Sequence, residues 1–256
     1  MKKKILILGQ GITAHQIIQE IGRNYDVYTC GNKSGDIGFK KINHFRINYK
    51  EKLKLLELLK EYKFDFLVPD GNDTSYLVSS FLSKKFGFPG YEDYKTTKII
   101  NSKIQLNHKL SKKKFIPKII KKKDLYSLKK NFFPVIFRPD KSESGIGVKK
   151  IETFNQFINF EKKNKQKGIL NEFINGEHFS CSIFFNKENF KFFFVKEVCA
   201  AFKVKFSLSP FIIDKNVEKR AITIAKYIIN FFKLKNGLLH LQFIKRKKEV
   251  FFIELT

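Results

Sequence analysis

The sequence predicts an α/β protein that begins with a parallel sheet and is of the α+β kind in its C-terminal part. Strand and helix signals alternate over about the first hundred residues, which is typical of a parallel sheet covered by helices. Further along, strand signals follow one another around polar turns, which is typical of antiparallel hairpins. A length of 256 residues suffices for one large domain or a few smaller units.

The alternation in the first part comes from short apolar runs that are followed by amphipathic ones. The expected strands are residues 4–8, 26–29 and 65–68, and the expected helices are residues 13–22, 50–60 and 74–86. The pattern turns helical again over residues 94–110. These elements predict a sheet with helices on its faces.

The turn after the first strand, Gly9-Gln-Gly-Ile-Thr-Ala14, fits the G-x-G-x-x-[GA] pattern of dinucleotide-binding proteins. In such proteins an acid at the tip of the second strand holds a ribose hydroxyl, whereas here Asp26 lies at that strand's start. We therefore favour a tight structural turn, with dinucleotide binding as the alternative. Asp70 and Asp73, after the third strand, either touch substrate or form a turn.

The second part contains an apolar strand that ends at Arg138. The loop after it, Ser142-Glu-Ser-Gly-Ile-Gly147, can expose several backbone N–H groups, and with the nearby cation it would cradle phosphate oxygens. A plain hairpin with a glycine turn is the alternative. The elements expected next are a helix at 154–163, a strand at 168–174, a hairpin around 186–189, a helix at 214–232 and strands at 237–244 and 249–255.

The formal net charge of +27 suggests nucleic acid, an anionic membrane surface or acidic small molecules as partners. The lysines are scattered, however, and the absence of tryptophan with abundant lysine and phenylalanine indicates compositional bias, so nucleic acid is unlikely as the partner. The cysteines are three in number without C-x-x-C spacing, which favours a reducing cytoplasm over a disulfide or zinc framework. No apolar run reaches the ~18 residues of a membrane span.

Four segments, taken together, resemble the ATP-grasp superfamily in order and spacing. They are 101–103 with 115–117, the strand and loop around Arg138, 171–177, and 240–242 with 252–254. Arginine in that strand and glutamine at position 242 look most similar to the carbamoyl-phosphate-synthase large-chain branch. The resemblance implies a Rossmann-like pre-ATP-grasp domain in residues 1–97 and an ATP-grasp domain in residues 98–256, with a lid subdomain at roughly 115–172.

The resemblance also implies a site for ATP and Mg²⁺. Lys103 and Arg138 would hold phosphates, with Arg138 as the catalytic cation. The loop residues Ser142, Gly145 and Gly147 would close over them.

At the other end of the nucleotide, Glu172, Phe173 and Ile174 would present backbone groups to adenine. The family has a ribose-binding glutamate where this chain has His178, with Glu177 one residue earlier, so both are candidates. Gln242 and Glu254, on adjacent antiparallel strands, would hold magnesium.

The implied function is an ATP-dependent ligase that joins a small-molecule carboxylate to an amine or thiol through an acylphosphate. The chain departs from the family at Glu143 and Ile146 in the loop, and at Thr256, where the family continues to asparagine and arginine. We therefore expect an incomplete ATP-grasp domain that binds ATP without turning over. The alternatives are a non-catalytic nucleotide-binding or regulatory protein and, least favoured, a basic nucleic-acid binder.

Overall fold

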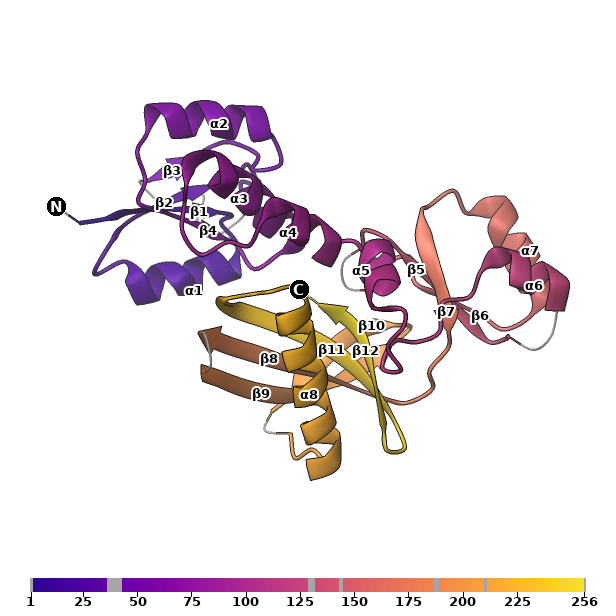
Figure 1. The fold of residues 1–256 in the computed structure, drawn as a ribbon. Coiled ribbons are helices and arrows are strands. Elements are labelled where there is room, and N and C mark those ends of the chain that lie inside the picture. Colours follow the sequence, from indigo (N-terminus) through magenta and orange to yellow (C-terminus); the bar gives the residue numbers. More distant parts are fainter. Residues whose placement is uncertain are drawn as a thin grey trace. The chain divides into compact units, whose positions relative to one another are not determined.

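The computed structural model describes residues 2–35, 43–128, 132–142, 145–186, 189–209 and 211–255. The departures from the family at Glu143 and Thr256 lie outside these residues. The chain divides into two compact units, Met1–Lys98 and Ile99–Thr256 (Figure 1). Among the described residues the first unit has one sheet and the second has two, and each unit has its own hydrophobic clusters.

The first unit is built on a parallel sheet with the strand order β3-β2-β1-β4. Its strands are β1 (Lys4–Leu8), β2 (Asp26–Cys30), β3 (His44–Phe45) and β4 (Phe66–Pro69). Its helices are α1 (Ile12–Ile21), α2 (Lys52–Glu61) and α3 (Asp73–Phe86), and α4 (Tyr94–Ile100) leads into the second unit. The parallel sheet confirms the prediction. Strand β3 was not among the expected strands, because it is too short to show a periodicity in the sequence.

Strand β1 lies at the centre of this unit because both of its faces are apolar. Ile5 and Ile7 are buried in a cluster with Ala14 of α1. Leu6 and Leu8 are buried in a second cluster, together with residues of α2 and α3. Successive side chains of a strand point to opposite faces, so a continuous apolar run predicts a strand covered on both sides.

The second unit begins with helix α5 (Lys103–Leu110) and contains a small antiparallel sheet with the order β6-β5-β7. The strands are β5 (Val135–Pro139), β6 (Lys149–Ile151) and β7 (Gly168–Glu172), and the helices beside them are α6 (Lys122–Leu128) and α7 (Phe154–Lys163). Phe157 of α7, Leu125 of α6 and Val135 of β5 share one buried cluster. This cluster anchors the helices to the small sheet.

A larger antiparallel sheet follows, with the order β10-β9-β8-β11-β12. Its strands are β8 (Glu177–Asn186), β9 (Asn189–Ala200), β10 (Lys203–Leu208), β11 (Asn236–Arg246) and β12 (Glu249–Leu255), and α8 (Lys215–Phe231) joins β10 to β11. Ala221, Ala225 and Ile228 of α8 are buried in one cluster with Phe179 of β8 and Phe243 of β11. The hairpin predicted around residues 186–189 and the amphipathic character of α8 are both confirmed.

The register of the large sheet separates two faces. Phe179, Cys181 and Ile183 of β8 lie on the core face toward α8, so the residues between them lie on the other face. We call this second face the polar face. It carries His178, Ser182, Glu197, Cys199, His240, Gln242 and Glu254.

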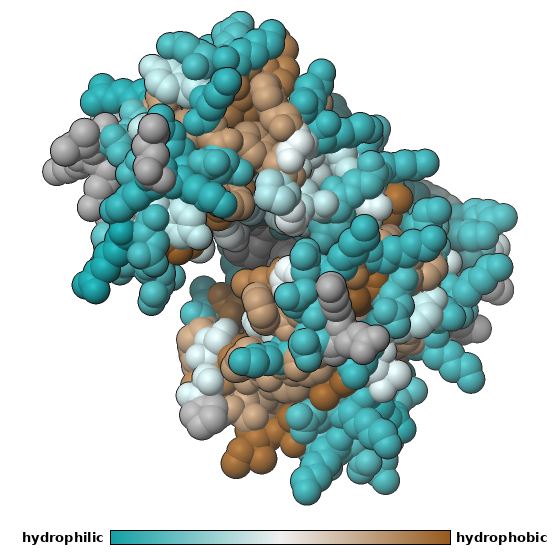
Figure 2. Space-filling view, turned by 60° about the vertical axis from the view of Figure 1, so that its left-hand side comes forward, coloured by the Kyte–Doolittle hydropathy of each residue, from teal (hydrophilic) through white to brown (hydrophobic). Residues whose placement is uncertain are grey.

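The helical pattern over residues 94–110 is broken in the structure between α4 and α5. Ser102 ends the pattern because its extended backbone and its hydroxyl cap the start of α5. No described helix is long and apolar enough to cross a membrane. On the face drawn in Figure 2, hydrophilic residues are spread widely over the surface between smaller hydrophobic patches.

Candidate functional site

Lys103 lies at the start of α5, where two side chains hold the helix end. Ser102 Oγ accepts a hydrogen bond from the Gln105 N–H at 3.2 Å. Asp140 Oδ1 accepts from the Ile104 N–H at 3.0 Å and from the Ser102 hydroxyl at 2.7 Å. These bonds satisfy N–H groups that the first turn of a helix leaves open. The backbone of Lys103 is therefore held in place.

The Lys103 ammonium reaches from α5 to a carboxylate on the last strand. Its Nζ lies 2.6 Å from Glu254 Oε1 and donates to the Ser142 carbonyl at 2.8 Å. The exposed fractions of the side chains are 10% for Lys103 and 24% for Glu254. The residues expected at the phosphates and at the magnesium are thus in direct contact, and water still reaches the pair.

Gln242 and Glu254 are direct partners across β11 and β12. Cross-strand partners point to the same side of a sheet, so both side chains lie on the polar face. Gln242 Nε2 donates to Glu197 Oε1 at 3.3 Å, which leaves the amide oxygen of Gln242 without a hydrogen-bond partner among the described residues. Carboxylate and amide oxygens are ligands that Mg²⁺ accepts.

Arg138 is buried, and its guanidinium fork is already used within the second unit. Nη1 donates to the Ile253 carbonyl at 2.6 Å, and Nη2 donates to the side-chain oxygens of Asn107 and Asn171 at 3.0 Å each. Burial lowers the pKa of Arg138, while the charge of Glu254 acts in the opposite direction. The expectation that Arg138 offers its fork to phosphate stays a prediction, and in this structure the fork joins β5 to α5, β7 and β12. Of its described donors, only Nε is buried without a partner.

Ser142, Gly145 and Gly147 lie in the loop between β5 and β6. Both glycines have positive φ angles, +72° and +77°, which side chains with a Cβ rarely adopt. A Cβ on Gly145 would collide with the Phe202 carbonyl, so the loop passes close to the turn between β9 and β10. The Ser142 hydroxyl is buried and has no hydrogen-bond partner among the described residues. The loop thus combines a constrained backbone with an unsatisfied polar group.

Glu172, Phe173 and Ile174 follow the end of β7, and part of their backbone is engaged. The Glu172 N–H donates to the Lys118 carbonyl at 2.9 Å, and the Glu172 carboxylate accepts from the Lys118 N–H at 2.8 Å. The Phe173 N–H donates to the Pro134 carbonyl at 3.2 Å. No hydrogen bond among the described residues engages the N–H of Ile174, so this donor is open to a ligand.

Glu177 and His178 are neighbours on β8 and therefore point to opposite faces. Glu177 Oε1 lies 2.5 Å from Lys196 Nζ and Oε2 lies 3.6 Å from Lys245 Nζ. The hydrogen bond from Lys196 lowers the pKa of Glu177. His178 lies on the polar face, where burial lowers its pKa and Glu197 acts in the opposite direction. Of the two ribose candidates, only His178 shares a face with the magnesium candidates.

A sequence model of the ATP-grasp domain matches residues 100–255. The chain belongs to the ATP-grasp family. The matched range includes Lys103, Gln242 and Glu254. The predicted superfamily is confirmed and, at the level of the family, so is an ATP-using enzyme of the ligase type with magnesium as the usual metal. The assignment to the carbamoyl-phosphate-synthase branch stays a prediction.

Solved structures share this fold at low sequence identity. Carboxyaminoimidazole ribonucleotide synthase from Aspergillus clavatus, complexed with ATP, has a TM-score of 0.80 at 13% identity, and the match covers 99% of this chain and 69% of that one. L-amino acid ligase from Bacillus licheniformis has a TM-score of 0.81 at 15% identity, with 99% and 66% covered. N5-carboxyaminoimidazole ribonucleotide synthetase from Thermotoga maritima has a TM-score of 0.76 at 17% identity, with 99% and 68% covered. No curated protein sequence matches the chain. The likenesses confirm the predicted fold class.

In the first unit of this ATP-grasp protein, Asp70 fills the glycine turn. Its Oδ2 accepts from the Gly11 N–H at 3.3 Å and its Oδ1 accepts from the Ala14 N–H at 3.0 Å. A carboxylate thus occupies the helix N-terminus where dinucleotide-binding proteins hold a pyrophosphate. Gly9 is required because a Cβ there would collide with Asp70. The structure therefore favours the structural interpretation of the turn, in which Asp70 caps α1 and Asp73 begins α3.

Several polar residues that contact the candidate site residues were not predicted from the sequence. Glu197 is buried on the polar face, and its spacing of two residues from Cys199 in a strand was a usable signal. Asn107 and Asn171, which accept from Arg138, are also joined by a hydrogen bond of 3.5 Å from Asn171 Nδ2 to Asn107 Oδ1. The asparagines gave no signal because they belong to elements far apart in the chain.

Proposed function

We propose that this protein is an ATP-dependent ligase that joins a small-molecule carboxylate to an amine or a thiol through an acylphosphate. In this proposal residues 98–256 form the nucleotide-binding domain with a lid at roughly 115–172. Residues 1–97 serve as the pre-ATP-grasp domain. The family match over residues 100–255 supports the ATP-dependent class, and the contacts of the second unit support the site.

The observation that carries the proposal is the contact of 2.6 Å between Lys103 Nζ and Glu254 Oε1. A cation on the first helix of the unit meets an acid on its last strand, directly opposite Gln242. Each charge neutralises the other in this arrangement. A magnesium-bound triphosphate offers both groups a stronger partner, because its oxygens attract the ammonium and its metal attracts the carboxylate.

The residues present fit ATP. Among the residues that the structure describes, Arg138 Nε and the Ser142 hydroxyl are buried without hydrogen-bond partners and the N–H of Ile174 is free. All three groups are hydrogen-bond donors, and a buried donor without an acceptor costs free energy. Adenine nitrogens and phosphate oxygens are acceptors, so a bound nucleotide would satisfy donors that the protein leaves open.

The chemistry has two steps. A carboxylate oxygen of the substrate attacks the γ-phosphorus, the bond to the β–γ bridging oxygen breaks, and ADP leaves. The amine or thiol then attacks the acyl carbon, phosphate leaves with the electron pair of the C–O bond, and the nucleophile gives up a proton. Magnesium, when held by Gln242 and Glu254, supplies neutralisation of phosphate charge. Lys103 stabilises the same charge from the helix side.

Calorimetry on the full chain tests the nucleotide site. We expect saturable binding of ATP with Mg²⁺ and no saturable binding of NADH, because Asp70 occupies the turn that a dinucleotide needs. Saturable binding of NADH without binding of ATP would overturn the proposal.

The ligase step is tested by ADP release across a panel of carboxylates, with and without amines and thiols. Release that requires one carboxylate and one nucleophile would support the proposal. ATP binding without carboxylate-stimulated release would favour the alternative, a non-catalytic nucleotide-binding protein.

A further inference from the structure

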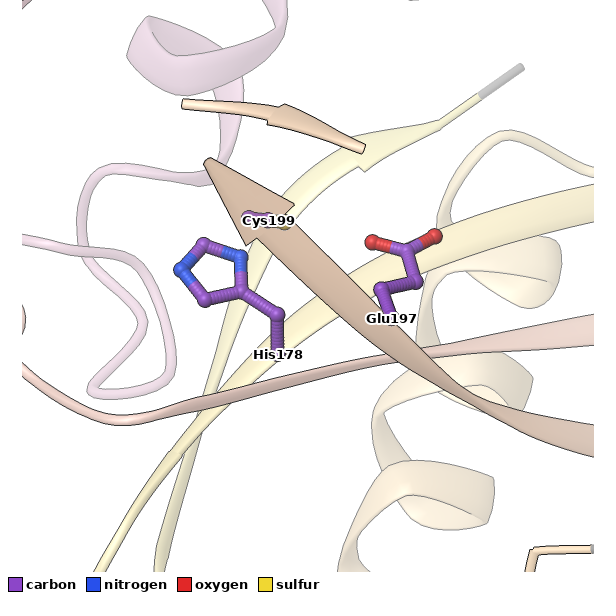
Figure 3. A group of neighbouring side chains, drawn as sticks. All are labelled: His178, Glu197 and Cys199. Atoms are coloured by element: carbon purple, nitrogen blue, oxygen red, sulfur yellow. The ribbon is translucent and has the colours of Figure 1, made fainter. Parts of the chain in front are cut away.

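Three side chains with metal-binding atoms meet on the polar face. Glu197 and Cys199 are two residues apart on β9, so they point to the same side. The register of β8 and β9 pairs Phe179 with Lys196, and its continuation places His178 opposite Glu197. One ligand atom from each of His178, Glu197 and Cys199 lies within 4.8 Å of the others (Figure 3). We call this group the His-Glu-Cys cluster.

Two members of the cluster have no hydrogen-bond partner in the part of the chain that the structure describes. Within the described residues, no hydrogen bond engages the His178 ring or the Cys199 thiol. The thiols of Cys30 and Cys181, by contrast, each donate to a backbone carbonyl, at 3.2 Å and 3.8 Å. His178 and Cys199 are both partly buried, so their atoms lie within reach of solvent and of a solvent-borne ion. The ring nitrogen and the sulfur are therefore available to a ligand.

Glu197 places a carboxylate in a nearly buried position, with 7% of the residue exposed. Among the described side chains, the one basic group within 4 Å of it is His240, whose Nε2 lies 3.8 Å from Oε1. A buried carboxylate with so little positive charge nearby is stabilised by an added cation.

We propose that His178, Glu197 and Cys199 bind a divalent transition-metal ion of the zinc class. Imidazole nitrogen, thiolate sulfur and carboxylate oxygen together are a ligand set for such an ion, whereas Mg²⁺ takes oxygen ligands. Metal–ligand lengths of about 2.0–2.3 Å put the ligand atoms of a tetrahedral site about 3.3–3.8 Å apart. Small side-chain rotations close the cluster to that size from its present limit of 4.8 Å. On binding, the Cys199 thiol releases its proton to solvent.

The cluster is distinct from the magnesium candidates. It lies on β8 and β9, whereas Gln242 and Glu254 lie on β11 and β12. One hydrogen bond links the two groups, from Gln242 Nε2 to Glu197 Oε1. The proposal goes beyond the ligase function and does not depend on it, because it rests on ligand atoms of different chemistry. A spectroscopic readout therefore tests it without any enzymatic assay.

Cobalt(II) titrated into the metal-free full chain is the probe, because a cobalt–thiolate bond gives a charge-transfer band in the near ultraviolet. We expect this band to saturate at one cobalt per chain, to be displaced by Zn²⁺ and to persist in excess Mg²⁺. Cys199→Ser should abolish the band, and His178→Ala should weaken cobalt binding by about tenfold or more. Glu197→Gln should weaken it in the same direction.

Cys181→Ala is the matched control, since Cys181 lies on the core face of the neighbouring strand. Cys30→Ala, in the first unit, replaces this control if the core variant unfolds. Circular dichroism and thermal unfolding of every variant separate loss of the site from loss of the fold. A wild-type protein without the band, or a band that persists in folded Cys199→Ser, would overturn the proposal.

Discussion

Helices α1 and α5 begin in a similar way in the two units of the molecule. In each case a carboxylate from a distant segment accepts N–H groups of the first turn. Asp70 binds the N–H groups of Gly11 and Ala14 at the start of α1. Asp140 binds the N–H of Ile104 at the start of α5. Both helix ends therefore have their positive pole neutralised from within the protein.

The two helix starts differ in what the first turn adds. Helix α1 has Gly11 as its N-cap residue, so the cap comes from the distant Asp70 and not from the N-cap residue itself. Helix α5 begins with Lys103, whose ammonium extends to Glu254 and the Ser142 carbonyl. The glycine turn of α1, the stronger sequence motif, is thus filled by Asp70, whereas the first turn of α5 adds a cation that is paired with Glu254. A carboxylate occupies both helix N-termini, so the difference between the two ends lies in the Lys103 side chain.

The largest expected effect is on the free energy of unfolding. It distinguishes a cation that stabilises the second unit from one that binds a ligand. Arg138→Met would remove the guanidinium that donates to the oxygens of Asn107, Asn171 and Ile253. We expect a loss of about 3–5 kcal/mol in the free energy of unfolding, measured with urea, because a buried charged donor is removed from three acceptors. The exposed Arg246→Met should cost about 1 kcal/mol or less. Full stability with lost ATP binding would instead make Arg138 a phosphate ligand.

The next effect is on ATP binding, and it tests whether the start of α5 and its partner Glu254 belong to the nucleotide site. Glu254→Ala removes a magnesium candidate and the partner of Lys103. We expect magnesium-dependent ATP binding to weaken by about tenfold to a hundredfold, and the metal-free component to change little. Glu249→Ala, on the same strand but exposed and paired with Arg246, is the control. Equal calorimetric titrations for wild type and Glu254→Ala would mean that Gln242 and Glu254 are only a polar strand pair.

A smaller effect tests the two caps against each other. Asp70→Ala and Asp140→Ala each remove a helix cap, and each should cost about 1–2 kcal/mol of stability. Asp140→Ala should also weaken ATP binding, because Lys103 loses its fixed backbone, whereas Asp70→Ala should leave ATP binding unchanged. Thermal unfolding and calorimetry on both variants provide the measurements. NADH binding gained by Asp70→Ala would show that the carboxylate alone had closed the α1 end.

The smallest effect concerns the thiols and leaves stability unchanged. Burial raises the pKa of Cys30 and of Cys181 to about 12, so neither forms a reactive thiolate at neutral pH. Burial raises the pKa of Cys199 as well, but this residue is partly exposed on the polar face. We expect a disulfide reagent at pH 8 to modify one thiol in the native protein and three after unfolding. Native labelling that persists in Cys199→Ser would contradict this assignment.

Local residue patterns were sufficient to predict most elements and the family. The apolar run at β1, the periodic face of α8 and the polar turn between β8 and β9 each follow from side chains close together in sequence. The pairing of Gln242 with Glu254 does not follow from the turn alone, because the register shifts by one residue between Phe243 and Gln242 and this shift brings Glu254, in place of Ile253, opposite Gln242. Strand β3 was not predictable, because its two residues are too few to show a periodicity.

Only the tertiary structure decided which polar groups are free. Arg138 and Glu177 were expected near a ligand, and Asp70 was either a substrate contact or part of a turn; each is held by residues of its own unit. A charged side chain binds whichever partner the fold brings nearest, and those partners come from elements far away in the chain. The sequence by itself therefore determined the family, the elements and the ligand-type residues, whereas tertiary contacts decided which of those residues a ligand can reach.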